Sequence, residues 1–114
     1  MKSRSAFLEI LAQNIGDKHP YSIEAYNFVI MTLAFARKKI GSAGDVPASE
    51  FVKALADYAE REFGPMAKKV LEHWGLKSFK DFGEIVFNMS EWGLLEMSGN
   101  DKMEEFLEAG EFKF

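Results

Sequence analysis

The chain has 114 residues, of which 47% are hydrophobic, and a formal net charge of −4. This length and composition are those of one globular domain, and they exclude a disordered chain. Cysteine is absent, which excludes disulfides, thiolate catalysis and cysteine-ligated zinc, and fits a cytoplasmic protein. We therefore expect a single domain over residues 1–114.

The first half of the chain predicts two helices. Apolar residues recur at helical spacing from Phe7 to Ile15, and Gly16 can end this helix. The second helix is predicted over Ile23 to Ile40, with Ser22 as its N-cap. This segment is apolar almost all round, which is typical of a helix buried at the centre of its domain.

The middle of the chain predicts three further helices, after Pro47 up to Phe63, from Pro65 to Trp74, and from Ser78 to Trp92. Each carries apolar residues on a stripe at helical spacing. Ser78 with Asp81 resembles a capping box at the start of the last of them.

The C-terminal segment predicts a short β-hairpin. Leu94 to Met97 and Glu111 to Phe114 are the two candidate strands, and Asn100 to Glu108 is a turn or one short helix. The predicted fold is thus a mainly α, compact bundle of about five helices in a single helical domain. Its last two helices form a helix-turn-helix, and the hairpin gives a winged-helix-like outline.

No catalytic, cofactor or metal site is predicted from the residue patterns. His19 and His73 lack a second ligand at metal-binding spacing, and nucleotide-binding and nucleophile motifs are absent. Lys53 and Arg61 lie four residues before and after Asp57, a pattern typical of a solvated, salt-bridged helix face. The acidic residues of this helix include Asp57, Glu60 and Glu62.

The chain also resembles a known family. The strings Phe-Gly-Pro-Met-Ala at 63–67 and Asp-Phe-Gly-Glu-Ile-Val-Phe-Asn at 81–88 resemble short bacterial proteins called uncharacterised repeat proteins, found largely in planctomycete and verrucomicrobial lineages. The resemblance covers residues 21–106. It implies a free-standing bacterial cytoplasmic protein, and it implies no established activity, cofactor or site residues.

The favoured function is a non-enzymatic protein-interaction or adaptor domain, or a self-associating one. Apolar side chains near the acidic C-terminal end could form an exposed interaction patch, or they could instead cover the core from one side. The residues of this candidate interaction patch are Met97, Met103, Phe106, Phe112 and Phe114.

Two other functions stay open. A winged-helix-like DNA-binding regulator would contact phosphates through Lys68, Lys69, Lys77 and Lys80, but the acidic C-terminal end argues against nucleic acid as a partner. An enzyme with an unrecognised site would use Tyr26, Asn88, His73 or the acids of the third helix. A membrane partner is not expected, because the most apolar stretch, residues 28–36, is too short to span a bilayer.

Overall fold

The computed structural model describes residues 9–10, 13, 21–41, 46–93 and 102–112, and these are mainly helical. Most of the predicted first helix lies outside the described residues, but residues 9, 10 and 13 are helical. The other helices are α2 (Ile23–Ile40), α3 (Ala48–Phe63), the 3₁₀ turn η1 (Gly64–Met66), α4 (Ala67–His73), α5 (Phe79–Glu91) and α6 (Lys102–Ala109).

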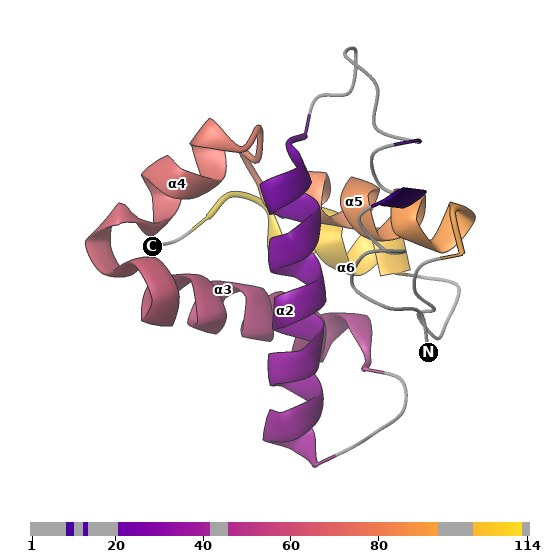
Figure 1. Ribbon diagram of the computed structural model, residues 1–114. Coiled ribbons are helices and arrows are strands. Elements are labelled where there is room, and N and C mark those ends of the chain that lie inside the picture. Colours follow the sequence, from indigo (N-terminus) through magenta and orange to yellow (C-terminus); the bar gives the residue numbers. More distant parts are fainter. Residues whose placement is uncertain (1–8, 11–12, 14–20, 42–45, 94–101, 113–114) are drawn as a thin grey trace.

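Helix α2 runs through the middle of the view in Figure 1, where α3 crosses it and leads to α4 on one side, and α5 and α6 lie on the other side. The apolar sequence predicted this central position, but the helix is not buried all round, because Ile23, Met31 and Ile40 are exposed. Gly41 ends the helix at a φ of 70°, and its N–H donates to the carbonyls of Arg37 and Lys38. Its buried residues come from all along its length: Ala25, Tyr26, Phe28, Val29, Thr32, Leu33 and Ala36.

Aromatic rings fill the space between the helices. Phe28 of α2 lies 5.9 Å from Phe82 of α5, measured between ring centroids. Phe82 in turn lies 5.8 Å from Phe112, which follows α6. Ring pairs at such spacings add to the stability that burial alone provides. Most phenylalanines of the described ranges therefore belong to this core or pack against it, whereas Phe87 is exposed.

Helix α6 closes this core, so Phe106 and Phe112 are not part of an exposed interaction patch and instead cover the core, the other role expected for them. Phe106 is fully buried, with its ring edge-on to Phe51 at 6.1 Å. Phe112 is 7% exposed, with its ring edge-on to Phe79 at 5.1 Å. These two rings are core residues because α6 packs against both α5 and α3. The side chains of Met97, Met103 and Phe114 lie outside the described residues.

The winged-helix-like part of the predicted architecture is not found in the described residues. Helices α4 and α5 follow one another through a short connection, but α4 packs mainly on α3, and α5 mainly on α6 and α2. The described ranges contain no strand of more than one residue: Glu111 forms an isolated antiparallel bridge with Ser78. Leu94 to Met97, the other candidate strand, lie outside the described residues.

The dimensions agree with those of a compact chain. The radius of gyration is 13.3 Å, close to the value of about 13 Å that a packed chain of this length should have. Within the described ranges, no helix combines the length and the hydropathy that crossing a membrane requires.

Candidate functional site

An open groove lined by aromatic rings lies where α2, α3 and the end of α4 meet. Its volume is about 230 Å³. The lining residues are Glu24, Asn27, Phe28 and Met31 from α2, Tyr58, Glu62 and Phe63 from α3, and Trp74 directly after α4.

The rings of the groove hold one another in place. The ring of Phe28, which is buried, lies at the centre, 5.4 Å from Tyr58, 5.9 Å from Phe63 and 5.8 Å from Trp74. Phe63 and Trp74 meet edge-on at 5.6 Å, with 81° between their planes. Contacts of this kind are specific in geometry, so they fix the orientation of the rings before any ligand arrives. Tyr58, Phe63 and Trp74 remain only partly buried.

Local backbone structure places Trp74 in this position. Its N–H donates to the carbonyl of Val70 as α4 ends, and Gly75 follows with a φ of 95°. The Trp74 carbonyl accepts a hydrogen bond from the backbone N–H of Ser22 at 3.2 Å. This hydrogen bond links the end of α4 directly to the start of α2, and it holds the backbone of Trp74 in place beside the groove.

The charges of the groove are all negative. Glu24 on α2 and Glu62 on α3 are both exposed, and none of the described lining residues is basic. Burial, and with it the neighbouring Glu62 carboxylate, raises the pKa of Tyr58 above its ordinary value. The phenol is thus a neutral hydroxyl at physiological pH, so the net charge of the lining comes from the two carboxylates.

A second hollow lies over the turn between α3 and α4. Its volume is about 400 Å³, and its lining residues are Glu60, Gly64, Pro65, Ala67 and Lys68. It has no aromatic wall, and it contains one carboxylate and one ammonium group. It therefore offers neither a rigid apolar surface nor a preference for one sign of charge.

Tyr26 and Asn88, two candidates for an unrecognised enzyme site, are brought together by the structure. The Asn88 side-chain amide donates to the Tyr26 hydroxyl at 3.1 Å, and the Tyr26 ring stacks on Trp92 at 5.5 Å. Burial raises the pKa of Tyr26 to about 12. Since Tyr26 is fully buried, this pair joins α2 to α5 inside the protein, and it does not line the aromatic groove.

A second polar contact, between α5 and the segment before α2, was not predicted. The Tyr21 hydroxyl lies 2.7 Å from Asp81 Oδ1 and also within hydrogen-bond reach of the carboxylate of Glu84, so the two carboxylates share its single proton. Asp81 Oδ2 accepts the backbone N–H groups of Lys77 and Ser78, so the predicted capping box at the start of α5 is confirmed. The Asp81 side chain thus both caps α5 and fixes it to the segment before α2.

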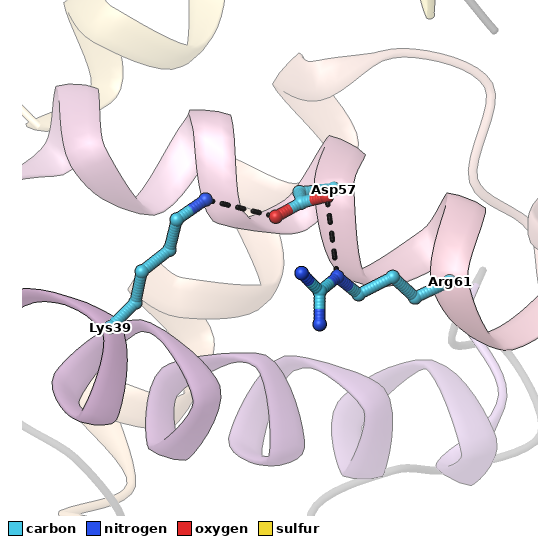
Figure 2. A network of polar contacts seen from close by, with 3 residues as sticks. All are labelled: Lys39, Asp57 and Arg61. Atoms are coloured by element: carbon cyan, nitrogen blue, oxygen red, sulfur yellow. Dashed lines mark hydrogen bonds and ion pairs between the residues drawn. The ribbon is translucent and has the colours of Figure 1, made fainter.

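The acids of α3 have different surroundings. Asp57 pairs with Arg61 at 3.6 Å, as the sequence predicted, and with Lys39 of α2 at 2.9 Å (Figure 2). Its pKa is lowered, mainly by the hydrogen bond from Lys39. The predicted salt-bridged face is confirmed for this residue, while Lys53 pairs with Glu50 instead. Glu62 belongs to the groove, a role that sequence reasoning missed.

The remaining sequence candidates that the structure describes lie at exposed positions. His73 is exposed at the end of α4, and His19 lies outside the described residues. In the part of the chain that the structure describes, no cluster of potential metal ligands is found. All four candidate phosphate contacts are exposed: Lys68, Lys69, Lys77 and Lys80.

Sequence reasoning also missed the aromatic residues of the groove. An apolar stripe on a helix predicts burial, and it does not indicate whether a neighbouring helix covers every ring. The one available signal was the i, i+4 spacing of Tyr58 and Glu62, which places a carboxylate beside a ring on the same face of α3.

No family model, no curated protein and no solved structure matches this chain.

Proposed function

We propose that this chain is a non-enzymatic protein-interaction domain that binds a partner through the aromatic groove. The observation that carries the proposal is that three pre-oriented rings, Tyr58, Phe63 and Trp74, are left partly uncovered at the junction of three helices. Aromatic side chains are enriched at the centres of protein interfaces, because they offer a large contact area and lose little conformational freedom on binding.

The size of the groove favours a single anchoring side chain as its occupant. A volume of about 230 Å³ is below the roughly 300–1,000 Å³ of pockets that enclose a drug-sized molecule. Catalysis is less well supported, because acid–base chemistry needs carboxylates sheltered from water, whereas Glu24 and Glu62 are exposed. The exposed thioether of Met31, at the groove edge, adds the adaptable apolar contact that interfaces often use.

A random peptide library panned against the folded protein tests this proposal. We expect the selected peptides to shift the backbone amide NMR signals of groove residues on α2, α3 and α4. Met31→Arg should abolish this binding, because it places a long side chain across the groove. Ile40→Arg is the matched control, since Ile40 is also an exposed apolar residue of α2, 39% exposed against 48% for Met31, and lies outside the groove.

Two results would contradict the proposal. The first is a library that yields no binder to the wild-type protein. The second is a set of binders that Met31→Arg and Ile40→Arg affect equally, because their site would then lie elsewhere.

The alternative, a winged-helix-like DNA-binding regulator, has less support. Lys80 on α5 is exposed, but Asp81 and Glu91 lie on the same short helix and would repel phosphates. A mobility-shift assay with random duplex DNA at low salt separates the two functions. The interaction-domain proposal predicts no salt-sensitive complex, and such a complex would favour the alternative.

A further inference from the structure

We propose that the side chain bound in the aromatic groove is a basic one, an arginine or lysine presented by the partner polypeptide. This inference rests on the proposed function and adds the chemistry of the ligand. Three features of the structure support it. They are the aromatic rings of the groove, its negative charge, and a neighbouring surface of α2 and α3 where two cations of the protein itself cover an aromatic ring.

The rings provide the first feature. A cation is attracted to the face of an aromatic ring, and to tryptophan most strongly, when it lies within about 6 Å of the ring centroid. Phe63 and Trp74 meet edge-on, with 81° between their planes, and both line the groove. The ring of Phe28 packs against both, at 5.9 Å and 5.8 Å. A guanidinium or ammonium group that enters the groove therefore has more than one aromatic ring among its neighbours.

The charges provide the second feature. Glu24 and Glu62 reach the groove from two different helices, and no described lining residue offsets them with a positive charge. A neutral apolar side chain would gain nothing from these carboxylates, and an acidic one would be repelled. A basic side chain instead gains from both carboxylates, while the apolar part of its stem can lie along Met31.

The neighbouring surface of α2 and α3 provides the third feature. There the ring of Phe35, 5.1 Å from Tyr58, is covered by two cations of the protein itself. The guanidinium of Arg61 lies 5.3 Å from the Phe35 centroid, and the ammonium of Lys39 lies 5.8 Å from it. Both cations pair with the carboxylate of Asp57 (Figure 2).

The groove therefore continues the same row of rings with the same type of acidic neighbour. Tyr58 contacts both Phe35, which the protein's own cations cover, and Phe28 of the groove. On the Phe35 side the cations come from the chain, and on the groove side they would come from the partner.

A titration with five-residue peptides tests this inference. Each peptide has one variable residue between glycines, with blocked ends, and the variable residue is arginine, lysine, citrulline or glutamate. Citrulline has the shape of arginine without the charge. The readout is the indole N–H signal of Trp74, with that of Trp92 as the internal control, because Trp92 stacks on Tyr26 and does not line the groove.

We expect the arginine and lysine peptides to shift the Trp74 signal and to leave the Trp92 signal in place. Citrulline should weaken binding by about fivefold to tenfold, the loss expected for a partly desolvated cation–aromatic contact with a nearby carboxylate. The glutamate peptide should produce no shift.

Charge-neutralising variants give the second measurement. Glu24→Gln combined with Glu62→Gln should weaken binding of the arginine peptide by about fivefold at low salt. Glu72→Gln combined with Glu91→Gln removes the same net charge at exposed positions outside the groove, and should change binding less than about twofold.

The outcomes separate this inference from the proposed function. If arginine and citrulline peptides shift the Trp74 signal equally, the groove binds side chains but does not select for charge, and only this inference is wrong. If no peptide shifts the Trp74 signal, and library peptides also leave it unchanged, both proposals are wrong. Shifts of Trp74 and Trp92 together would indicate non-specific binding and would overturn this inference.

Discussion

Replacing Tyr21 by phenylalanine should loosen the attachment of α5 to the start of α2. The Tyr21 side chain is 4% exposed, and the carboxylates of Asp81 and Glu84 share its hydroxyl proton. A hydrogen bond to a charged acceptor contributes about 1.5–3 kcal/mol. Water can reach both half-buried carboxylates after the change and replaces part of what is lost. We therefore expect Tyr21→Phe to lower the free energy of unfolding by about 1.5 kcal/mol at pH 7.

The pH dependence of this difference follows from the pKa of Tyr21. Burial, followed by the hydrogen bonds to Glu84 and Asp81, raises the pKa of the hydroxyl far above its ordinary value of 10.0. Above pH 10 the unfolded chain loses this proton while the folded chain keeps it, so the stability that Tyr21 contributes is complete below pH 10 and declines as the pH rises. The decline is about 1.4 kcal/mol per pH unit. The wild type and Tyr21→Phe should therefore become equally stable near a pH of about 11.

Urea denaturation at pH 7, 10 and 11, followed by tryptophan fluorescence, measures both effects. At pH 7 the midpoint of Tyr21→Phe should be lower by about 1 M, for an m-value of about 1.5 kcal/mol per molar urea. Other groups that titrate in this range are the same in both proteins, so they cancel in the difference. The reasoning is refuted if the two midpoints agree at pH 7, or if their separation does not shrink between pH 10 and pH 11.

Three other predictions concern the core and the surface. Thr32 is fully buried, and its hydroxyl finds no hydrogen-bond partner among the described residues, so Thr32→Val should raise the free energy of unfolding by about 1 kcal/mol in urea denaturation. Phe106→Ala should lower it by about 3–5 kcal/mol because it opens a cavity beside Phe51, and a loss below about 1 kcal/mol would place Phe106 outside the core. The hydrogen bond from Lys39 lowers the pKa of Asp57, so the stability that this pair contributes is present above the ordinary pKa of 3.8 and is lost as the pH falls through the folded value. The melting temperature of Asp57→Asn should therefore depend less on pH between pH 5 and pH 2 than that of the wild type. Identical pH profiles of the two proteins would contradict this pairing.

The helix ends could be predicted from the sequence, because the signals that set them are local. Gly41, Gly75 and Gly93 all adopt positive φ at the ends of helices, as glycine at that position predicts. Leu76, the residue after one of these glycines, is fully buried and its N–H donates to the carbonyl of Leu71, so the chain folds back on the last turn of α4.

Tertiary contacts explain where prediction from the sequence was wrong or incomplete. Phe106 and Phe112 were candidates for an exposed patch, and the packing of α6 across α3 and α5 buries them. No spacing rule within α6 contains that information. The groove has the same origin: Phe28 and Phe63 lie 35 residues apart in the sequence, and their contact depends on how α2 and α3 cross.

The most direct measurement of the central claim is the set of intermolecular nuclear Overhauser effects between the arginine peptide and the protein. The account predicts contacts from the arginine side-chain methylene protons to the ring protons of Trp74 and Phe63, and to the methyl group of Met31. Contacts to Trp92, or to the exposed Phe87 and Leu107 instead of the groove, would contradict it.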